Sequence, residues 1–381
     1  MTNLDELRER IDKADEKLIK VLEERLDVVA DIGKHKIENN IPVIDRTRSG
    51  LVVKKALDRL ENKGYSGEIT AIVSNIIHVS EDMQKRLYTI NSDGRYIDSV
   101  INASKPTKMD DENIKIVYQG TVGSFGQMAL HQYFGNDKKN IENLDSFEDV
   151  FEKVCSGEAD YGVLPIENSQ TGSIVEIYDL FRKYRAYIVG ETELAIQQNL
   201  LGIKGATLSD IKTVYSHQQG ILQSKEFLKE HKNIETVALS NTAVSAKYVS
   251  EQQDITKGAI ASKLAAEAFG LEIIKENINT RSNNTTKFII ISKSPEIRSN
   301  AEKISLCFTL PNTPGALSQV MLVFAKNDLN MLKIESRPIW NKKFEYFFFC
   351  DIVGNLNDKA VKEALNEIAT CTGYMEILGN Y

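Results

Sequence analysis

The sequence predicts a multidomain protein in which an all-α domain, a two-lobed α/β domain and an α+β ferredoxin-like domain follow one another. Three observations predict this order. Residues 3–37 lack proline and repeat apolar residues at helical spacing. From residue 114 onward, short β-rich runs alternate with helical ones, and residues 303–381 read as a βαββαβ unit. The chain of 381 residues also exceeds what one hydrophobic core usually serves.

The amino-terminal domain, residues 1–90, is predicted to be entirely helical. Its first helix covers about residues 3–37 and would be about 50 Å long. Its apolar stripe is too long to be buried within so small a domain, so the stripe predicts a partner chain and a homo-oligomer. Pro42 interrupts the pattern, and two further helices are predicted at residues 45–62 and 67–89.

The composition and the apolar pattern change in the middle of the chain. Residues 91–113 mix Gly, Pro, Ser, Asp and Lys without a sustained period, which is typical of a linker. The α/β domain is assigned to residues 114–295, where runs such as "IKIVYQG", "YGVLPIE", "TVYSH" and "KFIIIS" alternate with helical stretches. Its length suits two lobes.

The carboxy-terminal domain is assigned to residues 303–381. The expected order is strand "KISLCFTL", turn "PNTPG", helix "ALSQVMLVFAKN", strand "LNMLKIESRPIW", turn "NKK", strand "FEYFFFCDIVG", a helix over 357–371 and strand "YMEILG". This order is that of a ferredoxin-like fold.

Composition excludes several classes of function. The chain is 42% hydrophobic and carries no apolar run of the roughly 20 residues that a membrane helix needs, and its start, "MTNLDELRER", lacks the apolar core of a signal peptide. We therefore expect a cytoplasmic protein with no membrane partner. A formal charge of −7 argues against a nucleic-acid partner. The cysteines and histidines are scattered, so we expect no metal and no cofactor.

The helical domain carries a set of polar residues that can serve an anionic ligand. Arg8 and Arg25 are 17 positions apart, about 25 Å along one helix, so both can reach one small molecule only if two long helices run antiparallel in a dimer. Each arginine alone reads more simply as a solvated surface residue. The further members of the set are Lys36, Asp45, Arg48, Ser80 and Gln84.

The stretches "LRERIDKADEKLIKVLEERLDVVADIGKHK", "PVIDRTR" and "SEDMQ" resemble the all-helical chorismate mutase domain, an intertwined dimer. The resemblance implies chorismate as substrate, bound by Arg8 from the partner and by Arg25, Lys36, Asp45, Arg48, Ser80 and Gln84, with Lys36 and Gln84 as the catalytic donors to the ether oxygen. This pericyclic rearrangement needs no acid or base, but it does need cations that hold two carboxylates. Ser49 stands where the family usually has glutamate.

Six motifs of the α/β domain occur in the order seen in prephenate dehydratases: "GTVGSFGQMA", "ADYGVLPIENSQTGSI", "YSHQQGILQS", "SNTAVSA", "GAIAS" and "NNTTKF". Prephenate loses carbon dioxide and hydroxide to become phenylpyruvate, so a donor must face the leaving oxygen. A carboxylic acid would repel the substrate carboxylates once ionised, whereas a threonine hydroxyl donates without charge. The resemblance makes Thr286 that catalytic donor.

The same resemblance implies a substrate-binding set around Thr286. Its members are Asn168, Ser169, Thr171, Gly172, Ser173, Ser216, His217, Gln219, Gln223, Asn241, Thr242, Ala243 and Lys287. Lys287 replaces the family's usual arginine, which loses the bidentate fork, and Gln218 replaces its usual proline. Taken singly, Asn168 also fits an Asx-type turn after Pro165, and Thr286 also fits β-propensity at the start of a strand.

The last domain resembles the ACT domain of these dehydratases through "TPGALSQV" and "KIESRPI". The resemblance implies L-phenylalanine as an allosteric feedback inhibitor, bound between two ACT domains. The residues assigned to that site are Gly315, Ala316, Leu317, Glu335, Ser336 and Arg337. Read as structure alone, these motifs are a helix start and a turn at a strand end.

Together, the three resemblances identify the chain as a bifunctional chorismate mutase and prephenate dehydratase, with chorismate and prephenate as its substrates and a homo-oligomeric state, dimer or tetramer. Two alternatives stay open. The helical domain could only dimerise beside a monofunctional dehydratase, an interpretation that Ser49 favours. The two-lobed unit is also similar in architecture to periplasmic binding proteins, so the chain could be a non-enzymatic amino-acid sensor.

Overall fold

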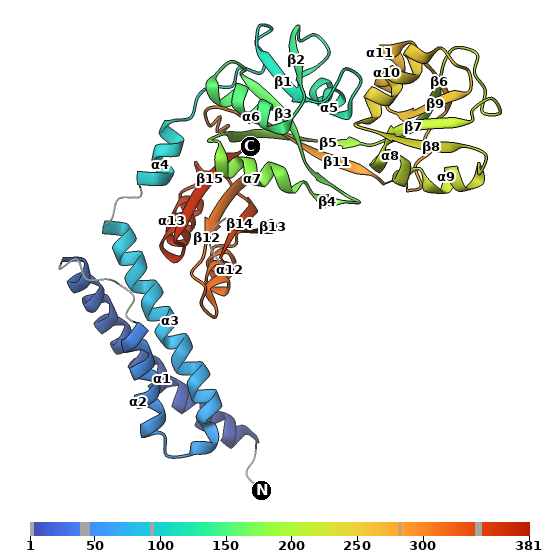
Figure 1. The fold of residues 1–381 in the computed structure, drawn as a ribbon. Helices are drawn as coiled ribbons and strands as arrows, with labels where there is room; N and C mark the ends of the chain where they lie inside the picture. Colours follow the sequence, from blue (N-terminus) through green and yellow to red (C-terminus); the bar gives the residue numbers. More distant parts are fainter. Residues whose placement is uncertain (1–3, 39–45, 92–94, 282, 340–344) are drawn as a thin grey trace.

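The computed structural model describes residues 4–38, 46–91, 95–281, 283–339 and 345–381. Figure 1 shows long helices at the amino-terminal end, a two-lobed α/β part at the opposite end and the carboxy-terminal domain beside the first lobe. The predicted fold class is therefore confirmed: helical, two-lobed α/β and α+β parts follow in that order. Within the described residues, no helix combines the length and the apolar character needed to cross a membrane.

The amino-terminal helices are α1 (Leu4–Glu38), α2 (Arg46–Arg59) and α3 (Ser66–Asn91), with a short 3₁₀ turn at Lys63–Tyr65. They match the predicted helices closely. Val29 of α1 is buried, but most of the apolar stripe is not: Ile11 and Val28 are 62% and 58% exposed. A single chain therefore leaves the stripe of α1 open to solvent, as its length predicts.

The predicted linker is wrong in one respect, because residues 95–102 form helix α4 (Arg95–Asn102). Ile97 and Val100 belong to the same buried core as Ile304 and Phe308 of the carboxy-terminal domain. The backbone amide of Ile377 donates a 2.8 Å hydrogen bond to the hydroxyl of Tyr96. The apolar spacing of α4 spans only two turns, which is too short to stand out from its polar surroundings.

The strands of the first lobe form one end of a sheet that continues into the carboxy-terminal domain, and helices cover this end. Its strands are β1 (Lys115–Gln119), β2 (Asn140–Leu144), β3 (Tyr161–Asn168), β5 (Tyr187–Ala195) and β11 (Thr285–Ser292), in the order β5-β11-β3-β1-β2, with β4 (Gly172–Ser173) paired to the end of β3. Its helices are α5 (Phe125–Phe134), α6 (Phe147–Ser156) and α7 (Val175–Lys183). The strands β2 and β4 and the helix α6 were not predicted; β2 is a half-exposed edge strand without apolar alternation.

The second lobe has its own sheet of order β10-β6-β9-β7-β8. Its strands are β6 (Asn199–Gly202), β7 (Thr213–His217), β8 (Glu235–Leu239), β9 (Lys257–Ala261) and β10 (Glu272–Lys275), and its helices are α8 (Gln218–Gln223), α9 (Lys225–Glu230), α10 (Thr242–Gln252) and α11 (Lys263–Phe269). The chain crosses between the lobes after β5 and returns before β11. The amide of Ile196 donates to the carbonyl of Asn284, and that of Ile278 to the carbonyl of Gln198, so the two crossings are joined.

The carboxy-terminal domain has the predicted βαββαβ order. Its elements are β12 (Lys303–Thr309), α12 (Ala316–Lys326), β13 (Met331–Pro338), β14 (Tyr346–Val353), α13 (Lys359–Cys371) and β15 (Tyr374–Asn380). The predicted turn "NKK" lies outside the described residues. The strand β15 meets β5 of the first lobe at Gly379 and Ile188. A Cβ at position 379 would lie 2.0 Å from the carbonyl oxygen of Ile188, so only glycine permits this close approach of the domains.

Candidate active sites

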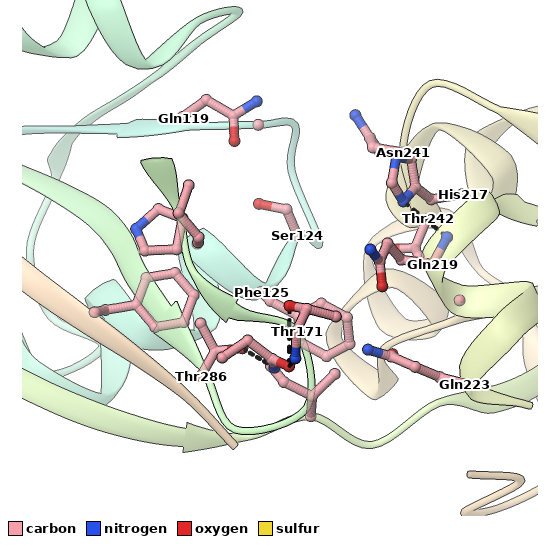
Figure 2. A pocket seen from close by; sticks show the side chains of 18 of the residues that line it. Gln119, Ser124, Phe125, Thr171, His217, Gln219, Gln223, Asn241, Thr242 and Thr286 are labelled. Carbon is pink, nitrogen blue, oxygen red and sulfur yellow. Dashed lines mark hydrogen bonds between the residues drawn. The ribbon is translucent and has the colours of Figure 1, made fainter. Parts of the chain in front are cut away.

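A cleft of about 430 Å³ lies between the two lobes of the α/β part. Figure 2 shows Gln119, Ser124 and Thr286 on one side, with His217, Gln219 and Asn241 across the gap. The described lining residues are Gln119, Gly120, Ser124, Phe125, Gly126, Phe147, Pro165, Asn168, Thr171, Ile174, Ile196, Gln198, His217, Gln219, Gly220, Gln223, Ser240, Asn241, Thr242, Thr286 and Phe288. None of these is Asp, Glu, Lys or Arg, so the lining that the structure describes mixes polar and apolar side chains without a carboxylate, ammonium or guanidinium group.

Thr286 and Asn168 form the floor of this cleft from neighbouring strands. They are register partners in the antiparallel pairing of β11 with β3. The side-chain nitrogen of Asn168 donates to the hydroxyl oxygen of Thr286 at 2.8 Å and to Oδ1 of Asn284 at 2.8 Å. All three side chains are buried. A pleated strand pair thus holds the hydroxyl of Thr286 on a rigid support.

The orientation of the Asn168 amide is fixed by its other end. Its Oδ1 accepts hydrogen bonds from the backbone amides of Gln170 and Thr171, at 2.9 and 3.1 Å. Its nitrogen must therefore be the atom that faces Thr286. Because Thr286 accepts this hydrogen, its own hydroxyl hydrogen is left for another acceptor, and its side chain lines the cleft. The arrangement presents a neutral donor to whatever binds there.

Two helices begin at the cleft and supply positive potential without charged side chains. The helix α5 is capped by Ser124, which accepts from the amide of Gln127, and α10 is capped by Asn241, which accepts from the amide of Val244 at 2.7 Å. Both capping residues line the cleft. The amino-terminal ends of helices favour anions, so the cleft suits a negatively charged ligand.

The second lobe contributes further polar residues to the cleft. Nδ1 of His217 accepts from the backbone amide of Gln219 at 3.2 Å, which orients the imidazole. Oε1 of Gln223 accepts from the side-chain nitrogen of Gln198 at 3.0 Å. Of the residues predicted for this site, the structure brings Asn168, Thr171, His217, Gln219, Gln223, Asn241, Thr242 and Thr286 together around one cavity.

The other residues predicted for this site do not line the cavity. The hydroxyl of Ser169 donates to the carbonyl of Asn283 and accepts from the amide of Thr285, which ties the turn after β3 to β11. Ser216 is fully buried and donates to the carbonyl of Ile260. Lys287 lies 3.6 Å from Glu193, its register partner on β5.

The remaining three are Gly172, Ser173 and Ala243. Gly172 and Ser173 form β4, which pairs with the end of β3, and Ser173 donates to Glu335 of the carboxy-terminal domain at 2.9 Å. Ala243 is fully buried in the core of the second lobe. These three residues do not line the cavity, although their chain neighbours Thr171, Ile174 and Thr242 do.

No individual residue of the motif "GTVGSFGQMA" was predicted for the site, yet its Ser124 and Phe125 line the cleft, as does Gln119 directly before it. The motif "GTVGSFGQMA" was the available signal. Gly123 has a positive φ of 84°, and a Cβ there would lie 2.7 Å from the Cα of Ala265 in the second lobe. The hydroxyl of Ser262 donates to the carbonyl of Gly123 at 2.6 Å. This loop is therefore a point where the two lobes touch.

The helical domain holds only part of its predicted site in the described residues. The guanidinium of Arg25 on α1 makes a short contact with the hydroxyl of Ser80 on α3, and Ser80 is buried. Lys36 lies near the end of α1. Arg8 is well exposed and lies 3.2 Å from Asp5 of the same helix. Asp45 lies outside the described residues, as do the side chains of Arg48 and Gln84, whose backbones belong to α2 and α3.

Some of the residues predicted for an amino-acid site are exposed to solvent, whereas others contact the first lobe. Gly315, with a φ of 81°, is the N-cap of α12, where Ala316 is buried and Leu317 is partly exposed. On β13, Ser336 is exposed. Glu335 and Arg337 instead face the first lobe, where Arg337 lies 3.1 Å from Asp179. Among the described residues, no group of three His, Cys, Asp or Glu side chains is placed to hold a metal.

Three family models match successive parts of the chain. The family model for chorismate mutase type II matches residues 7–85, that for prephenate dehydratase matches residues 116–296, and that for the ACT domain matches residues 305–370. The bifunctional chorismate mutase/prephenate dehydratase of Buchnera aphidicola subsp. Acyrthosiphon pisum is 32% identical over 98% of this chain and 95% of its own length.

Two solved structures resemble a large part of the chain. A prephenate dehydratase from Arthrobacter aurescens, in complex with L-Phe, has a TM-score of 0.65 and 30% identity over 70% of this chain and 90% of its own. GqqA, described as a novel type of quorum quenching acylase, has the same TM-score and identity over 70% of this chain and 97% of its own. Since the Buchnera relative spans all three domains, the chain belongs to the family of bifunctional chorismate mutase/prephenate dehydratases.

Proposed function

We propose that the cleft between the two lobes is the prephenate dehydratase site, with Thr286 as the group that acts on the leaving oxygen. As a member of its family, the chain converts chorismate to prephenate and prephenate to phenylpyruvate. The observation that carries the proposal is the 2.8 Å hydrogen bond from Asn168 to Thr286. This bond leaves the hydroxyl hydrogen of Thr286 to face a substrate in an uncharged cleft.

The reaction requires a hydrogen-bond donor at the leaving oxygen, here the hydroxyl of Thr286, and a substrate held in a fixed position. Carbon dioxide leaves from one end of the prephenate ring, its bonding electrons make the ring aromatic, and hydroxide leaves from the other end. Thr286 donates a hydrogen bond to the departing oxygen as negative charge builds on it. Asn168 polarises and orients the hydroxyl. The described lining has no carboxylate that would repel the prephenate dianion and no Lys or Arg that would form an ion pair with it.

Binding of the two substrate carboxylates is assigned to neutral donors. The starts of α5 and α10, at Ser124 and Asn241, offer backbone amides and the positive ends of two helices. Gln219 and Gln223 offer amide hydrogens from the opposite lobe. Ser169, Gly172, Ser173, Ser216, Ala243 and Lys287 do not line the cleft, so we assign them to its support rather than to substrate contact.

For the helical domain, we propose a dimer in which α1 of a second copy covers the exposed apolar stripe. The stripe includes Leu7, Ile11, Leu18, Val28 and Ile32, all of them exposed in the single chain. Burying apolar area at about 25 cal/mol per Å² favours association of two such helices. The mutase site would then combine Arg8 of one chain with Arg25, Lys36, Asp45, Arg48, Ser80 and Gln84 of the other, where Lys36 and Gln84 face the ether oxygen.

L-Phenylalanine is proposed as the ligand of the ACT domain, because the Arthrobacter dehydratase was solved in complex with L-Phe. Gly315 and Leu317 at the start of α12, together with Ser336 of β13, are the accessible residues of the predicted site. Backbone amides at a helix start suit a carboxylate, and Leu317 suits an aromatic ring. A cytoplasmic location remains our expectation from composition.

A chorismate feed tests the whole assignment. The purified chain is given chorismate, and prephenate and phenylpyruvate are followed over time with and without L-phenylalanine. We expect both products to appear in sequence and L-phenylalanine to slow the second step. Prephenate that accumulates and decays only at its spontaneous rate would exclude the dehydratase assignment of the cleft, and chorismate that remains unchanged would exclude the mutase assignment.

A further inference from the structure

A buried glutamine stands on one of the two segments that join the lobes. Gln198 lies between the end of β5 and the start of β6, and only 2% of its surface is exposed. Its backbone amide donates to Oδ1 of Asn279 at 2.6 Å, and its carbonyl accepts from the amide of Ile278 at 2.9 Å. Both partners belong to the returning crossing between β10 and β11. The backbone of Gln198 is therefore fixed where the lobes are joined.

The side chain of Gln198 holds the side chain of Gln223. Its Nε2 donates to Oε1 of Gln223 at 3.0 Å, and both residues line the cleft. The backbone carbonyl of Gln223 accepts from the amide of Thr280 at 2.7 Å. Both the main chain and the side chain of Gln223 are thus anchored to the crossings. Figure 2 shows Gln223 reaching from the second lobe toward Thr171 across the gap.

The hydrogen bond from Gln198 decides which end of the Gln223 amide meets a ligand. Because Oε1 of Gln223 is occupied by Gln198, its Nε2 is the end that is left to face the cleft. Within the part of the chain that the structure describes, this Nε2 makes no hydrogen bond of its own. Gln223 therefore presents a hydrogen-bond donor to whatever binds between the lobes.

The orientation of the Gln198 amide leaves one of its atoms unpaired. Its Oε1 is buried and has no hydrogen-bond partner among the described residues. A reversed amide would bury an NH2 group with two hydrogens at that place, and buried N–H groups without a partner are rarer than carbonyl oxygens without one. The arrangement in which Gln198 donates is therefore favoured. Because an unpaired buried oxygen still lowers stability, an apolar residue of similar size would be expected here unless the donor is needed.

Prephenate needs donors from the second lobe. Its two carboxylates and its keto oxygen all accept hydrogen bonds, and its one donor is the ring hydroxyl, which the proposed function places at Thr286 on the first lobe. The described lining has no Lys or Arg, so a contact from the second lobe is attractive or repulsive according to how an amide is turned. An amide nitrogen attracts the substrate oxygens, whereas an amide oxygen repels them.

We propose that Gln198 is a positioning residue for substrate binding, which locks Gln223 with its nitrogen toward prephenate. The inference rests on the proposed dehydratase function of the cleft. Gln198 acts through Gln223, because its own unpaired oxygen is buried. Gln223 faces the substrate from the lobe opposite Thr286 and so contacts groups away from the leaving oxygen. Loss of this contact should weaken binding more than it slows the chemical step.

The first test is Gln198→Met in the whole chain, which keeps the length of the side chain and removes the donor. We expect KM for prephenate to rise about tenfold with little change in kcat, because hydrogen bonds to charged groups contribute on that scale. The melting temperature should not fall, since the change also removes the unpaired buried oxygen. Gln197→Met is the matched control: its side chain is exposed and does not line the cleft, so its KM should equal that of wild type.

A double-variant cycle tests whether Gln198 acts through Gln223. Gln223→Met alone should raise KM about as much as Gln198→Met does. The combined variant should raise KM no further, because the two residues serve one contact. Two independent contacts would instead multiply their effects on KM.

A reversal of the lock gives a second, opposite readout. Gln198→Glu keeps the size of the side chain but can only accept while it is ionised, so Nε2 of Gln223 turns toward it and the oxygen of Gln223 faces the substrate. We expect KM to rise about a hundredfold, more than in Gln198→Met, because repulsion is added to the lost hydrogen bond. Adding Gln223→Met to Gln198→Glu should then lower KM again, since methionine has no oxygen to repel the substrate.

The proposal is overturned if Gln198→Met leaves KM unchanged, if the effects of Gln198→Met and Gln223→Met multiply, or if Gln197→Met raises KM as much. A fall in melting temperature with unchanged KM would assign Gln198 to stability alone. Should Gln198→Met fail to fold, Gln198→Glu decides: the proposal falls if Gln223→Met does not lower the KM of that variant. A wild-type chain that does not convert prephenate would reject the dehydratase assignment of the cleft instead, so the two failures can be told apart.

Discussion

The side-chain nitrogen of Asn168 lies 2.8 Å from the hydroxyl oxygen of Thr286 in the floor of the cleft between the two lobes. Asn168 gives its other hydrogen to Asn284, and its own oxygen is fixed by two backbone amides of the turn that follows. Every hydrogen-bonding atom of this amide therefore has a partner. Buried polar groups that lose a partner cost about 1–3 kcal/mol, so this network favours a single arrangement.

Thr286→Ala removes the hydroxyl and should reduce dehydratase kcat about a thousandfold, since donation to a leaving group typically contributes on that scale. Thr286→Ser restores a hydroxyl and should recover part of the activity, limited by the freer rotation of serine. Steady-state rates with prephenate measure both. Mutase activity should not change in either variant, and parallel losses of the two activities would point to misfolding instead.

Asn168→Asp replaces the donor to Thr286 with a carboxylate. At neutral pH, the charged group cannot donate and repels the dianion, so we expect dehydratase kcat/KM to fall about a hundredfold. Burial disfavours the charged form, and lowering the pH protonates the carboxyl, which can then donate again. The variant should therefore gain activity relative to wild type as pH falls from 8 to 5.5. A pH profile parallel to that of wild type would contradict the role of this donor.

The long elements were predictable from sequence because their patterns are strong. The helix α1 and the carboxy-terminal βαββαβ order follow from sustained apolar periods. The helix α4 was missed, because its residues Ile97 and Val100 are buried by packing against the carboxy-terminal domain. That domain lies far later in the chain, so the local sequence carries no sign of this burial. Edge strands such as β2 carry no apolar alternation and are fixed by pairing with β1.

The candidate dehydratase site was predictable at the residues whose side chains line the cleft, such as Asn168 and Thr286. The sequence of a motif does not show which of its side chains face the ligand and which pack against the rest of the protein. Ser216 and Ala243 sit inside motifs but are fully buried, and Ser173 points to another domain. The contact between Ser173 and Glu335 joins residues 162 positions apart, which local sequence patterns do not encode.

Gly123→Ala should separate the two lobes at the glycine-rich loop. The new Cβ would lie 2.7 Å from the Cα of Ala265, and the backbone there cannot give way as a flexible side chain would. We expect dehydratase kcat/KM to fall about tenfold, because residues from both lobes must reach one substrate. Gly205→Ala is the matched control: its φ of 81° imposes the same backbone strain, but no atom lies within 4 Å of the new Cβ. Equal losses in the two variants would show that strain, not contact between the lobes, is the cause.

Arg8→Ala and Arg25→Ala should each abolish most mutase activity, because in the proposed dimer both arginines hold carboxylates of one substrate from two different chains. In a mixed dimer, the Arg8→Ala chain still carries Arg25 and its partner still carries Arg8, so one of the two sites is intact. Free exchange of equal amounts should thus restore about a quarter of wild-type activity, since half of the dimers are mixed. Dehydratase activity should not change in either variant. Mixed dimers isolated with two different affinity tags allow the measurement on a defined species. If these mixed dimers are as inactive as the single variants, Arg8 and Arg25 do not share a site across the α1 interface.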